Sequence, residues 1–144
     1  MSYLYKYPRP AVTVDAITFR PTVDGSYEVL LIQRKHEPFK GMWAFPGGFV
    51  DEGEDPNDAV HRELEEETKI TGMKFSQLGF WGRPGRDPRG HTVSLVYWGV
   101  SQNSDLTPEA ADDAQKAEWF PIDHLPELAF DHEGIIKVAI ERLG

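Results

Sequence analysis

The chain has 144 residues, of which 40% are hydrophobic, and a formal net charge of −9. This size and apolar content suffice for one core, and we expect a single domain over residues 1–144. The lack of Cys excludes a disulfide framework and a cysteine zinc site, and the acidic balance argues against long nucleic acid as a partner. No apolar run is long enough for a membrane span and no basic leader precedes one, so we expect a cytoplasmic protein without a membrane partner.

The first part of the chain predicts an irregular arm followed by two paired strands. Met1–Pro10 is rich in Tyr and Pro, whereas Ala11–Phe19 is β-branched and apolar around Asp15, which is typical of a strand. Thr22–Ser26 has turn chemistry, and the continuous Val-Leu-Leu-Ile run in Tyr27–Arg34 predicts a second strand that is buried on both faces. We expect these two strands to form a hairpin.

A short strand at Trp43–Phe45 is predicted to lead into a loop over Pro46–Gly53 and then a helix. Pro followed by two Gly disfavours regular structure, which is why we expect the loop. Asp55 is a good N-cap and Pro56 suits the first helical position. Two apolar residues four apart give this helix a stripe to bury: Val60 and Leu64.

The rest of the chain predicts three more strands and a closing helix. Glu109–Lys116 is acidic and predicts no particular structure, and Asp131 is a candidate cap for the closing helix, whose apolar residues fall at helical spacing. The predicted strands are Met73–Trp81, Thr92–Val100 and Trp119–Phe120. Strands with one helix in the middle and one at the end favour an α+β sandwich, with helices covering a mixed sheet.

The helix after Asp55 concentrates most of the negative charge. Nine acidic residues lie between Asp51 and Glu67, against one Arg. On a helix, three of the glutamates share one face: Glu63, Glu66 and Glu67. Clustered like charges destabilise a helix, and hard oxygen ligands suit Mg²⁺ or Mn²⁺, so a divalent cation is the expected compensation. The alternative is a solvated acidic helix face.

The spacing of these residues resembles a known signature. The pattern is similar to the box of the Nudix hydrolases, G-x5-E-x7-R-E-U-x-E-E-x-G-U with U apolar. Here Gly48 is followed after five residues by Glu54, and Glu54 is followed after seven residues by Arg62-Glu63-Leu64-Glu65-Glu66-Glu67. The departure is Lys69, where the pattern has Gly at the helix C-terminus. One hypothesis is that Gly72 makes the turn instead.

The resemblance implies a Nudix-type α/β/α sandwich and a Mg²⁺-dependent hydrolase of a nucleoside diphosphate linked to another group. It implies that Glu66 and Glu67 ligate metal, and that Glu63 ligates metal or deprotonates the attacking water. Arg62 would pair with Glu54 and hold the glutamates in place; an ordinary helical ion pair between Arg62 and Glu66 is the alternative.

Other positions follow from the same resemblance. The backbone at Gly47 and Gly48 would approach the metal or the phosphates closely. A further metal carboxylate often comes from a late loop in this family, and Asp112 and Asp113 stand where that loop is expected; Asp113 is our candidate. An acidic pair in a polar loop is otherwise simply solvated.

The substrate is predicted from the loop Gly82–Gly90, whose sequence is GRPGRDPRG. Pro84 lies fifteen residues beyond Lys69, and this placement resembles the ADP-ribose pyrophosphatases. The candidate ligands for phosphate or ribose are Arg34, Arg83, Arg86, Arg89 and His91. The alternative is a loop whose arginines are tied to its own Asp87.

Three functions therefore remain open. The leading hypothesis is hydrolysis of ADP-ribose to AMP and ribose 5-phosphate. The others are a pyrophosphohydrolase of modified nucleoside triphosphates and a non-catalytic Nudix domain that senses ADP-ribose for a regulator. Relatives with such an arginine loop are often dimers, so a homodimer is an expectation that rests on the resemblance.

Overall fold

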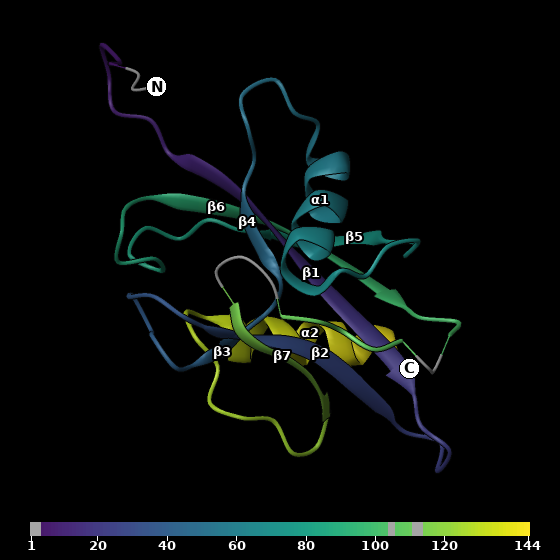
Figure 1. Cartoon of the computed structure of the whole chain (residues 1–144). Helices are drawn as coiled ribbons and strands as arrows, with labels where there is room; N and C mark the ends of the chain where they lie inside the picture. Colours follow the sequence, from purple (N-terminus) through teal and green to yellow (C-terminus); the bar gives the residue numbers. More distant parts are fainter. Residues whose placement is uncertain (1–3, 104–105, 111–113) are drawn as a thin grey trace.

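The computed structural model describes residues 4–103, 106–110 and 114–144 (Figure 1). Seven strands form one mixed sheet: β1 (Ala11–Pro21), β2 (Tyr27–Arg34), β3 (Trp43–Ala44), β4 (Gly47–Phe49), β5 (Ser76–Trp81), β6 (Thr92–Val100) and β7 (Ala114–Pro121). Two helices accompany it: α1 (Pro56–Thr68) and α2 (His132–Arg142). None of the helices in the described part of the chain is long and apolar enough to span a membrane.

The sheet is built around β1. Its path runs β3-β2-β1-β6-β5, with β4 paired to β1 and β7 paired to β2. The β1–β6 pair is parallel along nine registered positions, from Ala11 opposite Thr92 to Phe19 opposite Val100, whereas the other pairs are antiparallel. The expected pairing of the first two strands is therefore confirmed, and so is the mixed sheet.

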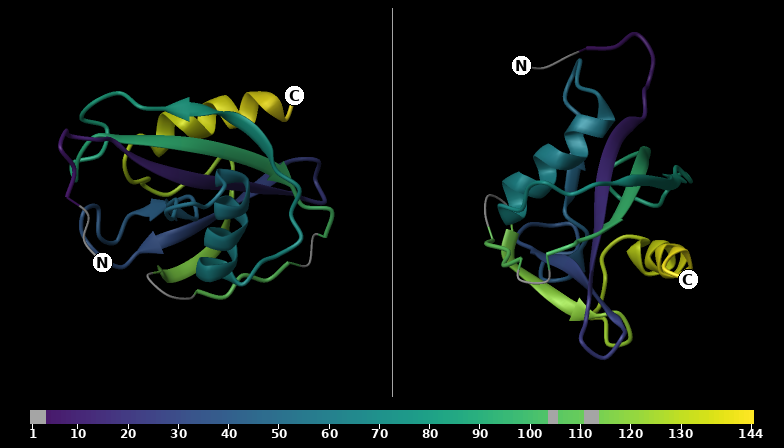
Figure 2. Two further views of the ribbon diagram at one scale, coloured as in Figure 1. Left: turned by 90° about the horizontal axis from the view of Figure 1, so that it is seen from above. Right: turned by 90° about the vertical axis from the view of Figure 1, so that its right-hand side faces the viewer.

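The two helices cover opposite faces of the sheet, as the right-hand view of Figure 2 shows. Alternate residues of a strand point to opposite faces. Accordingly Val14 and Ala16 of β1 pack in the cluster that contains the apolar stripe of α1, while Ile17 and Phe19 pack with α2. The Val-Leu-Leu-Ile run of β2 is buried throughout. The predicted α+β sandwich is confirmed.

Helix α1 begins as its sequence predicts. Asp55 is the N-cap, and its Oδ1 accepts a hydrogen bond of 2.8 Å from the Asn57 N–H, with Pro56 in the first turn. The helix ends at Lys69, which takes the left-handed conformation itself with φ 66°. The hypothesis that Gly72 replaces it in this role is therefore wrong, because the Lys69 N–H already closes the helix on the Glu65 carbonyl at 2.8 Å.

Other local expectations need correction. The predicted Pro46–Gly53 loop contains β4, because backbone pairing with β1 needs no side chains. Strand β7 begins at Ala114, well before Trp119, since pairing with β2 extends through a segment without a clear strand pattern. Asp131 occupies the N-cap position of α2 but makes no side-chain cap hydrogen bond; its carboxylate binds Arg86 instead.

The arrangement of β1 and β2 opens the sheet at one end. Their register pairs Phe19 with Val29 and Pro21 with Tyr27. Toward Ala11, β1 has β4 as its antiparallel neighbour, while β2 has β3 opposite Ile32 and Gln33, on the same edge that pairs with β1 further along, because β7 takes the other edge. Residues at this end of all four strands line part of the main cavity.

Candidate active site

One cavity of about 550 Å³ collects most of the predicted site residues. Its walls come from β1, β2, β4, the outer face of α1, the loop between β5 and β6, and the segment that leads into α2. The predicted residues that line it are Arg34, Gly47, Gly48, Glu63, Glu66, Glu67, Arg86 and Arg89. Segments far apart in sequence therefore meet at one place.

The acidic wall rests on α1 and on the close approach of β4. Glu63 is 9% exposed, and a Cβ added to Gly48 would lie 2.6 Å from its carboxylate. Only glycine leaves room for Glu63 here. The Gly47 N–H donates to Glu67 Oε2 at 3.3 Å, which ties the start of β4 to the far end of the same helix face.

Arg62 organises the carboxylates although it does not line the cavity. Its Nε and Nη2 donate to the two oxygens of Glu54 at 2.7 and 2.9 Å, and its Nη1 donates to Glu63 at 2.8 Å and to Glu66 at 3.2 Å. These bonds lower the pKa of Glu54 to about 2. Burial raises the pKa of Glu63 and outweighs the opposing effect of Arg62. The ion pair with Glu66 is thus one member of a larger network.

The glutamates offer hard oxygen donors of the kind that Mg²⁺ and Mn²⁺ prefer. In the described part of the chain, no three acidic or His side chains converge into a ready metal cage. Arg62 draws the carboxylates of Glu63 and Glu66 toward itself, while Glu67 accepts from Gly47. Three glutamates on one wall with a single guanidinium among them retain net negative charge, so the donor set fits a divalent cation.

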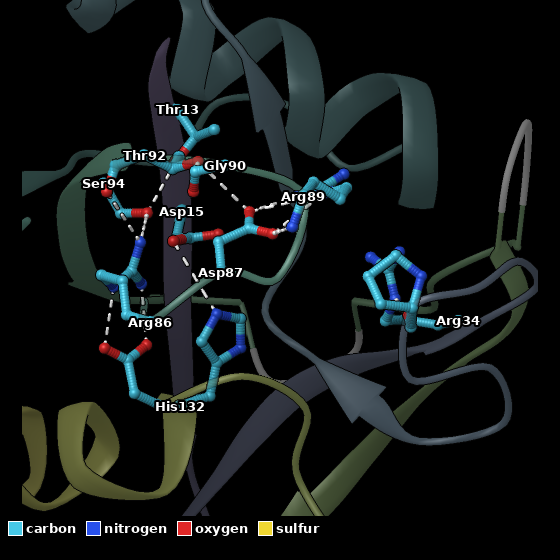
Figure 3. A network of polar contacts seen from close by, with 12 residues as sticks. Thr13, Asp15, Arg34, Arg86, Asp87, Arg89, Gly90, Thr92, Ser94 and His132 are labelled. Carbon is cyan, nitrogen blue, oxygen red and sulfur yellow. Dashed lines mark hydrogen bonds and ion pairs between the residues drawn. The ribbon is translucent and has the colours of Figure 1, made fainter. Parts of the chain in front are cut away.

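The opposite wall is a buried polar network (Figure 3). Asp15 on β1 is 8% exposed, and burial raises its pKa to about 7. His132 at the start of α2 is 3% exposed, and burial lowers its pKa to about 3. The Phe45 N–H donates to His132 Nδ1 at 3.3 Å, which places the imidazole proton on Nε2, 3.9 Å from Asp15 Oδ2.

Two of the predicted arginines are bound to carboxylates at this wall. The side chain of Arg86 is 4% exposed and binds Asp131 through two hydrogen bonds of 2.8 and 2.7 Å, while its Nη1 donates to Ser94 Oγ at 2.7 Å. Arg89 pairs with Asp87 at 2.8 Å and remains 40% exposed. Burial would raise the pKa of Asp87, but the bonds from Arg89 hold it below its usual value.

The remaining predicted residues lie elsewhere. Arg83 and His91 are exposed and do not line the cavity; the His91 ring shares a hydrogen bond of 2.9 Å with the Gly82 carbonyl. Arg34 lines the cavity, donates to the Pro38 carbonyl at 2.7 Å and places its guanidinium 5.0 Å from the centre of the Phe130 ring. Asp113 lies outside the described residues.

Several cavity residues were not predicted from the sequence. Among them are Asp15, Phe45, Phe130 and His132, while Phe49 carries an aromatic ring that the sequence favours as core although it could stack on an adenine. Arg89 lies between two of these rings, 5.1 Å from the centre of Phe49 and 5.4 Å from that of Phe130. Phe130 has φ 54°, a conformation that is costly for a bulky residue. The sequence feature that could have indicated a site role for Asp15 is its position as the one carboxylate in an apolar strand. No sequence feature indicates such a role for Phe130.

Known proteins resemble the chain over most of its length. An ADP-ribose pyrophosphatase of Methanocaldococcus jannaschii is 47% identical over 131 residues, which span 91% of this chain and 73% of the relative. The ADPR responsive transcriptional repressor NtrR of Acinetobacter baylyi is 37% identical over 143 residues, and the match spans 96% of this chain but 56% of the repressor.

A solved structure adds to these relatives. The bifunctional NMN adenylyltransferase/ADP ribose pyrophosphatase of Francisella tularensis, complexed with AMP and a Mn ion, superposes with a TM-score of 0.79 at 31% identity. The match spans 97% of this chain and 44% of that one. The NUDIX domain model matches residues 9–140. By this match, and by its likeness to these relatives, the chain belongs to the Nudix family.

Proposed function

We propose that the protein is a Mg²⁺-dependent hydrolase that cleaves ADP-ribose to AMP and ribose 5-phosphate. The observation that carries this proposal is the composition of the main cavity. Three glutamates of α1 form one wall, and Arg34 and Arg89, which come from other segments, also line the cavity. A pyrophosphate needs cations around its oxygens, and this arrangement offers both a divalent-ion site and guanidiniums. The similarity to the archaeal pyrophosphatase supports the choice of ADP-ribose.

The carboxylates of Glu63, Glu66 and Glu67, with the Gly47 backbone, would hold the metal. When bound, Mg²⁺ or Mn²⁺ supplies charge neutralisation at the phosphates and lowers the pKa of coordinated water. Glu63 is positioned to orient the attacking water and take its proton, because Arg62 fixes its carboxylate from one side and Gly48 leaves it space on the other.

The reaction breaks one phosphoanhydride bond. The water oxygen bonds to one phosphorus, the bridging oxygen leaves with the other phosphate, and the proton of water passes to a carboxylate. Arg34 and Arg89 would bind phosphate oxygens and stabilise the charge on the leaving phosphate. The aromatic rings of Phe49 and Phe130, which flank Arg89, limit water at the cavity rim.

The test is AMP release from ADP-ribose with Mg²⁺, with Mn²⁺ and with EDTA, beside a panel of nucleoside triphosphates and dinucleotides. We expect metal-dependent formation of AMP and ribose 5-phosphate in equal amounts. Faster turnover of an oxidised purine triphosphate would overturn the assignment of ADP-ribose as substrate but leave the proposed metal-dependent hydrolysis in place. Tight ADP-ribose binding without turnover of any panel member would reject the enzyme.

The second candidate function is that of an ADP-ribose sensor. The observation in its favour is the 37% identity to an ADPR responsive repressor. The signature Glu54, Arg62, Glu63, Glu66 and Glu67 favours the enzyme, because Arg62 binds three of these glutamates. A sensor has no need for that network.

We also propose that the chain forms a homodimer. The N-terminal arm projects from the body (Figure 1) and exposes Leu4, Tyr5 and Tyr7. Burial of these side chains against a second copy would be favourable. Light scattering on the purified protein gives the mass directly, and a monomer at micromolar concentration contradicts the proposal.

A further inference from the structure

Asp15 is a buried carboxylate of the cavity that the proposed chemistry does not use, and unlike the buried Asp87 it is not paired with an arginine among the described residues. It lines the cavity beside Gly47, its registered neighbour on β4, and it is 8% exposed. Within the described part of the chain, no group donates a hydrogen bond to it; His132 Nε2 lies 3.9 Å from its Oδ2, beyond hydrogen-bond range. A buried carboxylate without donors is costly, and the cost is recovered when a ligand supplies them.

The arginine donors near Asp15 are bound elsewhere, and the Nε2–H of His132 faces it from 3.9 Å. Arg86 places both arms of its fork on Asp131 and its remaining nitrogen on Ser94. Arg89 binds Asp87. His132 accepts from the Phe45 backbone and stacks on the Phe45 ring at 4.4 Å, so this contact fixes its orientation. Figure 3 shows the resulting arrangement, with Arg86 and Arg89 bonded to other groups and a dashed line from His132 to Asp15 that marks their 3.9 Å contact.

The charges at this wall restrict the class of ligand. Arg86 and Arg89 act on Asp15 electrostatically, and the carboxylates of Asp131 and Glu63 oppose them, so the charge around Asp15 is close to balanced and calls for no additional cation. A phosphate would be repelled by the carboxylate itself. A neutral group with two hydroxyl donors satisfies both carboxylate oxygens without changing the balance of charge. In a nucleotide sugar, the vicinal diol of a ribose is such a group.

We propose that Asp15 is a specificity-determining residue that accepts hydrogen bonds from the vicinal hydroxyls of a substrate ribose. The proposal rests on the proposed function, since it assigns a part of the same substrate. The flat adenine suits the aromatic ring of Phe49 at the rim, which is 45% exposed, and Arg89 is left for the phosphates. The buried polar wall around Asp15 is then available to a ribose of the substrate.

The experiment compares ADP-ribose with two analogues, one without the 2′ and 3′ hydroxyls of the adenosine ribose and one without those of the distal ribose. Calorimetry in EDTA gives the affinity of each, and kcat/KM in Mg²⁺ gives the turnover. We expect wild type to disfavour one analogue by about tenfold or more, because its carboxylate is then left unpaired. Asp15→Asn should reduce that preference to about threefold and leave the response to the other analogue unchanged. The analogue that wild type disfavours shows which of the two riboses contacts Asp15.

Asp123→Asn, an exposed site of equal charge change, is the control and should match wild type. The proposal is overturned if wild type and Asp15→Asn discriminate equally between ADP-ribose and the analogue. A variant that discriminates as wild type does but needs more Mg²⁺ overturns it too, because Asp15 would then belong to the metal site. If Asp15→Asn does not fold, the wild-type affinities still test the proposal. Binding of both analogues as tightly as ADP-ribose would overturn it. Absence of AMP release from wild type rejects only the proposed function, because the affinities in EDTA still test Asp15.

Discussion

Glycine at position 48 is required by the position of a neighbouring carboxylate. A Cβ there would lie 2.6 Å from Glu63, and the carboxylate is the flexible end of its side chain, so it would move and the backbone would stay. Gly48→Ala should therefore lower kcat for ADP-ribose by about 100-fold, as expected when a catalytic group is misplaced, with little change in Tm. Steady-state kinetics with a thermal melt checks this. An unchanged kcat would contradict the role of Glu63.

Lys69 stores strain at the end of α1. Its φ of 66° lies in the left-handed region, which costs roughly 1 kcal/mol for a residue with a Cβ. Lys69→Gly should raise the free energy of unfolding by about 1 kcal/mol and Tm by about 3 °C. Lys69→Ala is the matched control, because it removes the side chain and keeps the strain. Equal effects of the two variants would show that the backbone conformation is not the cause.

Two elements are fastened together by Arg86. The loop between β5 and β6 reaches α2 through its bidentate bond to Asp131. Burial would raise the pKa of Asp131, but Arg86 outweighs it and holds that pKa low. Arg86→Lys cannot reproduce the fork, and urea denaturation should detect a loss of about 2 kcal/mol. Arg83→Lys, at an exposed position of the same loop, should be neutral; a comparable loss there would refute the assignment.

The elements that the sequence predicts well are those whose own pattern is strong. Strands β1, β2 and β6 carry runs of β-branched and aromatic residues, and α1 carries a cap, a Pro and an apolar stripe. Strand β4 consists of Gly47, Gly48 and Phe49 and exists because β1 pairs with it. The early part of β7 is a strand because it pairs with β2. Such tertiary pairing leaves no local signal.

The candidate site divides in the same way. The acidic wall was predictable because its residues lie within one helix and the preceding loop, at spacings that resemble a known signature. The polar wall brings together Asp15, Arg86, Asp131 and His132 from three distant segments, and no spacing encodes that meeting. Asp131 illustrates the difficulty: its position predicted a helix cap, and only the fold brings Arg86 to it.

At the scale of the whole molecule, His132 links stability to pH. Burial lowers its pKa from 6.5 to about 3. Between these values the unfolded chain binds a proton at this site and the folded chain does not, so His132 reduces stability as pH falls below 6.5. Asp15 acts in the opposite direction, since its raised pKa favours the folded state at low pH and that contribution is lost as pH rises from 3.8 to about 7.

Chemical denaturation between pH 7 and pH 4 should therefore show a smaller loss of stability in His132→Asn than in wild type. The Asn oxygen can still accept from the Phe45 N–H, but the side chain does not titrate. Asp15 is present in both proteins, so their difference isolates the histidine. Parallel stability profiles for the two would contradict the depressed pKa.

The central claim is that the acidic face of α1 is a metal-dependent catalytic wall, and one pair of variants tests it most directly. Glu67→Gln removes a carboxylate that lines the cavity, whereas Glu65→Gln makes the same change on the exposed side of the helix. AMP release from ADP-ribose is measured at saturating Mg²⁺, with circular dichroism to verify the fold. The account predicts that Glu67→Gln loses at least about 100-fold in rate while Glu65→Gln remains near wild type. Turnover by Glu67→Gln at a rate close to wild type would contradict it.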